Sequence, residues 1–126
     1  MKNLLCNSLY LEDVKYVANM KLSWEKLLDT RILITGASGL IGSFLVDVLM
    51  WRNKNAGMNC KVYAIGRNEI IAKERFASYW DDTTFIFIKH DISYPLCGEV
   101  FRYASKDFRT IRRRILKKYL SNSNTE

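Results

Sequence analysis

Three glycines, spaced three residues apart, separate an apolar segment from an amphipathic one. The sequence at this point is Gly36-Ala-Ser-Gly39-Leu-Ile-Gly42. Residues 31–35 before it form a short run of β-branched and apolar residues, in which apolar and polar positions do not alternate. Such a run is typical of a strand buried on both faces of a parallel sheet. After it, apolar residues recur at helical spacing up to about Arg52. These residues are Leu40, Ile41, Phe44, Leu45, Val48 and Leu49. The pattern predicts a strand, a tight turn and a helix.

The following residues repeat this alternation of strand and helix. A polar loop containing Gly57 leads to a second apolar run at residues 61–65. Asn68 is expected to cap a helix that ends at about Trp80, and residues 84–89 form a third strand-like run. Such alternation predicts parallel strands joined by right-handed crossovers. The expected fold is α/β, a Rossmann-type doubly wound parallel sheet truncated to its first βαβαβ half.

The length of 126 residues corresponds to about one domain. We expect residues 1–30 to form an N-terminal helical extension, with helix between Tyr10 and Leu28 and a short turn capped by Ser23. Residues 31–96 are expected to form a partial dinucleotide-binding domain. Residues 97–126 form an atypical basic tail that includes a predicted amphipathic helix.

The formal net charge of +7 is concentrated in this tail. From Arg102 onward there are eight Lys or Arg residues and only two acids, Asp107 and Glu126. A basic amphipathic helix could bind acidic membranes or nucleic acid. The alternative is a solvated helix whose apolar face covers the sheet. We favour the second, because no aromatic stacking array or base-reading motif accompanies the charge.

The cysteines and the one histidine point to neither a disulfide framework nor a metal site. Cys6, Cys60 and Cys97 are odd in number, widely spaced and in no Cys-x-x-Cys pair, which favours a reducing cytoplasm. His90 is the only histidine and has no cluster of ligands beside it. The longest apolar run is far below the roughly 20 residues of a membrane span. We expect a cytoplasmic protein without a metal.

Each glycine of the motif has a physical role in holding phosphate. Gly36 permits the tight turn after the strand, Gly39 lets the backbone approach a pyrophosphate, and Gly42 lets the helix pack closely on the strand. Backbone N–H groups at the start of the helix, together with its positive dipole end, attract phosphate charge. The motif in this context predicts dinucleotide binding.

The spacing Thr35-Gly-x-x-Gly-x-x-Gly resembles the extended short-chain dehydrogenase/reductase family, whose members act on nucleotide sugars as epimerases, dehydratases and decarboxylases. Ala64-Ile-Gly-Arg-Asn68 lies at the end of the second strand, where the family contacts the adenosine ribose. His90-Asp91-Ile92 follows the third, where members place Asp against the adenine amino group. The run from His90 to Leu96 is most similar to the His-Asp-Val-x-x-Pro-Leu stretch of UDP-glucuronic acid decarboxylases. The expected N-terminal helix, which ends in Trp24-Glu-Lys-Leu27, is similar to the corresponding helix of bacterial polysaccharide-pathway members. The resemblance covers roughly residues 10–96.

The resemblance implies that this chain binds NAD through two kinds of residues, those of the glycine motif and those that follow the second and third strands. These are Gly36, Ser38, Gly39, Leu40, Ile41, Gly42, Arg67, Asp91 and Ile92. NAD enzymes usually have an acidic residue about 20 residues after the motif, whereas Arg67 stands here and can accommodate a 2′-phosphate. Arg67 could equally stack on adenine or face solvent. We expect NAD, with NADP as the alternative.

No catalytic residue is assigned. In the family a Tyr-x-x-x-Lys pair transfers protons. None of the seven tyrosines has a lysine four residues later, and Lys106 lies one residue too close to Tyr103. The sequence therefore predicts the NAD-binding N-terminal part of a nucleotide-sugar epimerase, dehydratase or decarboxylase, inactive as this chain, whose sugar substrate binds only to an intact relative. We expect a truncated or frame-disrupted product, unrelated to the family from about Cys97.

An alternative is a non-catalytic dinucleotide-binding module that acts with a partner chain. In a full doubly wound sheet, the first strand is flanked on both sides by other strands. No fourth strand is recognisable after Leu96. The first strand would then be an exposed apolar edge, through which the chain could associate with itself or with a partner.

Overall fold

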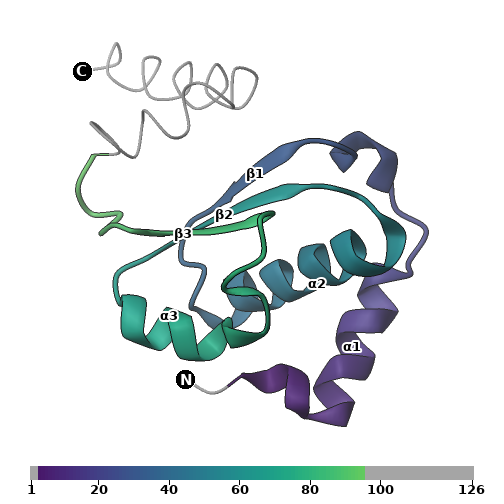
Figure 1. Ribbon diagram of the computed structural model, residues 1–126, viewed down its shortest axis with the longest axis horizontal. Helices are drawn as coiled ribbons and strands as arrows, with labels where there is room; N and C mark the ends of the chain where they lie inside the picture. Colours follow the sequence, from purple (N-terminus) through teal and green to yellow (C-terminus); the bar gives the residue numbers. More distant parts are fainter. Residues whose placement is uncertain (1–2, 96–126) are drawn as a thin grey trace, which may run out of the picture. The chain divides into compact units, whose positions relative to one another are not determined.

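The computed structural model describes residues 3–95. They contain a three-stranded parallel sheet formed by β1 (Arg31–Ile34), β2 (Lys61–Gly66) and β3 (Phe85–Lys89), in the order β1-β2-β3 (Figure 1). Ile34 of β1 lies opposite Ala64 of β2, and Gly66 of β2 lies opposite Lys89 of β3. The predicted first half of a doubly wound α/β fold is confirmed.

Helices connect the strands on one face of the sheet. α2 (Leu40–Ala56) joins β1 to β2, and α3 (Glu69–Arg75), followed by the 3-10 helix η3 (Ala77–Tyr79), joins β2 to β3 (Figure 1). Asn68 caps α3 as predicted, because its side chain accepts a hydrogen bond from the Ile71 N–H. The helix predicted to run to about Trp80 ends at Arg75 instead, where the chain tightens into η3.

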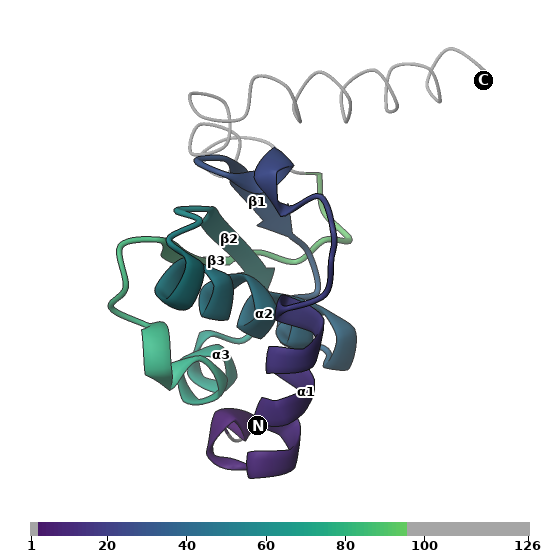
Figure 2. The ribbon, with the colours of Figure 1, turned by 90° about the vertical axis from the view of Figure 1, so that its right-hand side faces the viewer.

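The N-terminal residues add a third layer below α2. α1 (Ser8–Ala18) packs against α2 on the side away from the sheet (Figure 2). Two 3-10 helices flank it, η1 (Leu4–Cys6) and η2 (Trp24–Leu27). The helix predicted between residues 10 and 28 is therefore interrupted, and the Ser23 side chain makes no capping hydrogen bond. The described residues up to Tyr94 form one compact unit that includes this N-terminal segment.

The predicted single apolar stripe on α2 is partly wrong. Leu40 and Ile41 are 81% and 75% exposed, and Leu45 is also exposed. The reason is that α2 lies between two layers and buries side chains on two sides. Val46, Leu49 and Met50 join the core beneath the sheet, whereas Val48 packs with residues of α1. The helix also continues to Ala56, past the predicted end at Arg52, and stops at Gly57, which adopts a left-handed conformation with φ of 59°.

β1 is half-buried along its length rather than buried on both faces as predicted. Within residues 3–95 it pairs only with β2, so it lies at an edge of the sheet. An edge strand has one neighbour fewer than a central one, which leaves its side chains partly open. The basic tail predicted at residues 97–126, with its amphipathic helix, lies outside the described residues.

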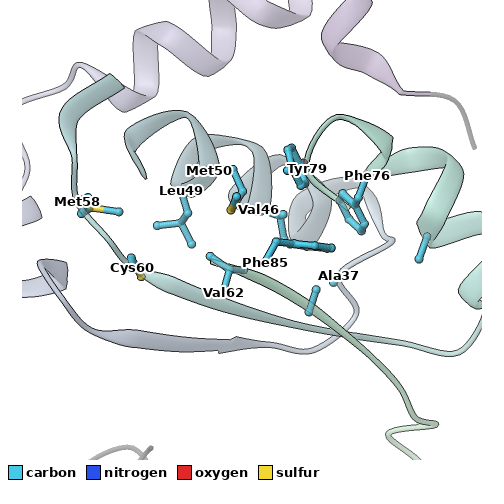
Figure 3. Close-up of a cluster of buried hydrophobic side chains, with 12 residues drawn as sticks. Ala37, Val46, Leu49, Met50, Met58, Cys60, Val62, Phe76, Tyr79 and Phe85 are labelled. Atoms are coloured by element: carbon cyan, nitrogen blue, oxygen red, sulfur yellow. The ribbon is translucent and has the colours of Figure 1, made fainter. Parts of the chain in front are cut away.

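The main core lies between the sheet and the helices α2 and α3 (Figure 3). Phe85 of β3 is at its centre, with ring centroids 5.3 Å from Phe76 and 5.2 Å from Tyr79. Val46 and Met50 contribute from α2. This packing holds the two crossover helices, α2 and α3, against the sheet.

Replacing Phe85 by Ala should reduce the free energy of unfolding by about 3–5 kcal/mol, because a large buried ring is lost and a cavity remains. Urea denaturation followed by far-UV circular dichroism measures the change. Leu9→Ala is the control, since Leu9 is 72% exposed and its truncation should change stability by less than about 0.5 kcal/mol. Equal stability losses for the two variants would contradict the core described here.

Candidate functional site

The three predicted groups of site residues lie at the carboxyl-terminal end of the sheet, where its strands finish. The strands are parallel, so their carboxyl ends point the same way, and these ends lead into the glycine motif, Arg67 and Asp91. Backbone hydrogen bonds join the three segments. The Ala37 N–H donates to the Ile65 carbonyl at 3.0 Å, and the His90 N–H donates to the Gly66 carbonyl at 2.9 Å.

The glycine motif forms a compact turn. Gly36 has a backbone φ of 61°, a conformation that residues other than glycine rarely adopt. The Gly39 N–H donates to the Gly36 carbonyl at 3.0 Å, which closes the turn. A Cβ atom on Gly42 would lie 2.3 Å from the Gly36 carbonyl oxygen, so only glycine fits there. The close approach predicted for Gly42 therefore exists, but its contact is the turn itself rather than the strand.

The start of α2 is open to an anion. Its N-cap residue is Gly39, which has no side chain to cap the first turn, and that turn contains no acidic residue. Gly36, Gly39, Leu40 and Ile41 are all exposed, so the turn and the helix start lie at the surface. Free N–H groups and the positive end of a 17-residue helix attract negative charge. This geometry suits a phosphate or pyrophosphate group.

Ser38 lies beside the end of β2. A Cβ atom on Gly66 would be 3.6 Å from the Ser38 hydroxyl oxygen and 3.1 Å from the Phe87 ring. Any side chain at Gly66 would therefore crowd the space between the glycine turn and β3. The sequence prediction missed this role of Gly66, although a glycine at the end of a buried strand is a signal for close approach.

Arg67 and Asp91 lie on neighbouring loops. Arg67 is exposed, and Asp91 begins a turn in which its Oδ1 accepts hydrogen bonds from the Ser93 N–H at 2.9 Å and the Ser93 hydroxyl at 2.7 Å. These bonds, followed by the positive charge of Arg67, lower the pKa of Asp91. Asp91 is therefore a carboxylate near Arg67. Ile92, the last predicted contact residue, is 52% exposed.

Other reactive groups contribute little to this site. Within residues 3–95 no three side chains of His, Cys, Asp or Glu come together as metal ligands. The His90 ring lies 3.2 Å from the Tyr94 carbonyl oxygen, as in a local turn. Burial raises the pKa of the Cys60 thiol, which makes its thiolate scarce. Cys97 lies outside the described residues. In the described part of the chain no helix is long and apolar enough to cross a membrane.

Gly42→Ala should destabilise the protein by about 1–3 kcal/mol and loosen the turn, because the added methyl group must displace the Gly36 carbonyl. Hydrogen exchange at the Ala37 and Gly39 amides is the measurement that reports on the turn. Gly57→Ala is the matched control, since it strains only the end of α2. Unchanged protection of both amides in Gly42→Ala would show that this contact does not hold the turn together.

Comparison with known proteins links the chain to enzymes of Arabidopsis thaliana. It is 40% identical over 72 residues to UDP-glucuronic acid decarboxylase 3, covering 57% of this chain and 20% of that protein. It is 39% identical over 70 residues to UDP-glucuronic acid decarboxylase 6, covering 56% and 19%. For UDP-glucuronic acid decarboxylase 4 the identity is 34% over 70 residues, covering 56% and 14%. No protein-family model and no solved structure matches.

The chain thus spans about one fifth of the length of the first of these relatives. Several relatives with the same name match at a similar level, and the described residues have the parallel α/β sheet that the sequence predicted. Over somewhat more than half of its length, the chain is similar to proteins named UDP-glucuronic acid decarboxylase, which confirms the resemblance found in its motifs.

Proposed function

We propose that this chain binds NAD at the carboxyl edge of its sheet, as the cofactor-binding part of a nucleotide-sugar epimerase, dehydratase or decarboxylase. The observation that carries this proposal is the glycine turn at the uncapped start of α2, on the same edge as Arg67 and Asp91. The similarity to UDP-glucuronic acid decarboxylases supports the substrate class, a nucleotide sugar of polysaccharide precursor synthesis.

In this proposal the two ends of the site hold different parts of the dinucleotide. The pyrophosphate lies against Gly36 and Gly39 and accepts hydrogen bonds from N–H groups at the start of α2, including those of Leu40 and Ile41. The adenosine half extends along the edge toward Arg67, Asp91 and Ile92. The nicotinamide, when bound, supplies hydride transfer with the sugar. The chain's own residues bind and orient the cofactor.

The sequence lacks the residue pair that transfers protons in the family it resembles. The Tyr-x-x-x-Lys pair that the family resemblance implies is absent from the 126 residues. We therefore expect this chain by itself to turn over no nucleotide sugar. The sugar-binding and acid–base residues belong, in this proposal, to parts of the longer relatives that the chain does not match.

NAD is the preferred dinucleotide because of the charges around Arg67. After the Ser93 hydrogen bonds, the positive charge of Arg67 also lowers the pKa of Asp91, so the Asp91 carboxylate lies within electrostatic range of Arg67. This neighbour compensates part of the positive charge that would attract the 2′-phosphate of NADP, and it repels that phosphate directly. NAD lacks the 2′-phosphate and carries no such cost.

Titration calorimetry should show micromolar binding of NAD and weaker binding of NADP. Gly39→Ala should weaken NAD about tenfold, or about 1.4 kcal/mol, because its methyl group occupies the approach of the pyrophosphate. Its φ of −71° and ψ of 172° are accessible to alanine. The added Cβ would lie 3.2 Å from the Gly36 carbonyl oxygen, a tight contact that requires a shift of only a few tenths of an ångström, so the turn should survive. Ser78→Ala, far along the chain on η3, is the control and should leave NAD binding unchanged. A folded wild-type protein with no affinity for either dinucleotide would refute the proposal.

Asp91→Asn should raise the ratio of NADP affinity to NAD affinity by a few-fold, since a repulsive charge near the 2′-phosphate is removed. The amide keeps the oxygen that accepts hydrogen bonds from Ser93, so the turn is preserved. Using the ratio cancels any general loss of adenosine binding. The shift should shrink at high salt, where charges are screened. A ratio that stays at the wild-type value would place the 2′ position away from Asp91.

A further inference from the structure

A charged pair is buried between the two crossover helices. Asp47 of α2 and Arg75 of α3 have fully buried side chains, and the Arg75 Nη2 atom lies 2.5 Å from the Asp47 Oδ2 atom. The second guanidinium nitrogen, Nη1, donates to Oδ1 at 3.4 Å. The two residues are 28 positions apart in the sequence, so the contact belongs to the tertiary structure.

Two tyrosine hydroxyls complete this polar cluster. The Tyr10 hydroxyl of α1 donates to Asp47 and accepts a hydrogen bond from Arg75 Nη2 at 2.7 Å. The Tyr79 hydroxyl of η3 also donates to Asp47. The Arg75 guanidinium carbon lies 5.5 Å from the ring centroids of Tyr10 and Phe76. Burial, reinforced by Asp47, raises the pKa of both tyrosines, so they remain hydroxyl donors.

Stability alone does not account for this cluster. Burying two charges costs several kcal/mol per ion, and well-packed apolar side chains often serve a fold equally well. Arg75 also keeps a buried Nε without a hydrogen-bond partner among residues 3–95. In some proteins, buried charges and directed hydrogen bonds instead select one arrangement of the elements that carry them.

The elements joined in this way are those that begin at the proposed cofactor site. α2 starts directly after Gly39, and Asp47 lies two turns further along it. α3 starts two residues after Arg67 and ends at Arg75. One ion pair therefore connects α2, which follows the glycine turn, to α3, which follows the loop at Arg67 (the ribose loop). Figure 3 shows Tyr79 and Phe76 next to Val46 and Met50 of α2, where these elements meet.

We propose that Asp47 and Arg75 are positioning residues that set the spacing between the pyrophosphate and adenosine-ribose parts of the cofactor site. The inference rests on the proposed function, since it concerns the same site. Tyr10 extends the link to α1, so the N-terminal segment contributes to cofactor binding without touching the cofactor.

The test compares ligands that span both parts of the site with ligands that occupy one. ADP reaches the glycine turn and the ribose loop together, whereas pyrophosphate reaches only the turn and adenosine only the loop. A fixed spacing favours the ligand that bridges both parts, because the second contact is then made at high effective concentration. Loss of the spacing should weaken ADP while leaving each fragment nearly unchanged. A merely structural role would weaken all three ligands by the same factor.

The variants are Asp47→Asn, together with an apolar quadruple replacement, Tyr10→Phe, Asp47→Leu, Arg75→Met and Tyr79→Phe. The quadruple variant leaves no buried charge unpaired and keeps the experiment decisive if Asp47→Asn fails to fold. Ser78→Ala is the control, because it removes only an exposed hydrogen bond between Asn3 and η3. Ligand-observed NMR on the full chain measures the three affinities.

We expect ADP affinity to fall about tenfold relative to the fragments, within the roughly 5–150-fold range of coupled sites. The control should retain the wild-type ratio. An unchanged ratio in a folded cluster variant would overturn the positioning role while leaving the proposed function intact. A wild-type chain that binds neither ADP nor pyrophosphate would overturn both.

Discussion

The contact between Gly42 and the carbonyl of Gly36 determines the rest of this structure. With no side chain between them, the first turn of α2 rests directly on the backbone that leaves β1. The Ala37 hydrogen bond to Ile65 then ties the same turn to β2. Two strands and their crossover helix are thereby fixed to one another at a single point. The proposed phosphate site uses the same turn, so the packing of the fold and this site depend on one short segment of backbone.

From this point, α2 serves as the central element of the described residues. It is covered by the sheet on one side and by α1 on the other, and it carries Asp47 where α1 and the α3–η3 segment converge on it. Burial on two sides explains why a polar residue in mid-helix is fully enclosed. Through Tyr10, the N-terminal segment also contacts the buried pair formed by Asp47 and Arg75.

Local features of the fold were predictable from the sequence, and features that depend on distant partners were not. The spacing of Gly36, Gly39 and Gly42 predicted the turn because each constraint acts within a few residues. The exposure of Leu40 and Ile41 was missed, since apolar periodicity alone does not show which side of a helix is covered. Arg75 has the sequence context of a solvated helix end. Its burial depends on Asp47, 28 residues away, which no local pattern reveals.

The two halves of the proposed site differ in how the sequence encodes them. Phosphate binding at the start of α2 uses backbone N–H groups, so side chains matter mainly by being absent, and glycines are the signal. The adenosine half depends on Arg67 and Asp91, whose mutual charge depends on the register of β2 and β3. Residue type at Arg67 alone favoured NADP, whereas the proposed preference for NAD also takes in the Asp91 carboxylate on the next loop. In this proposal, cofactor choice depends on two neighbouring strand ends, and a motif within one of them is not enough to predict it.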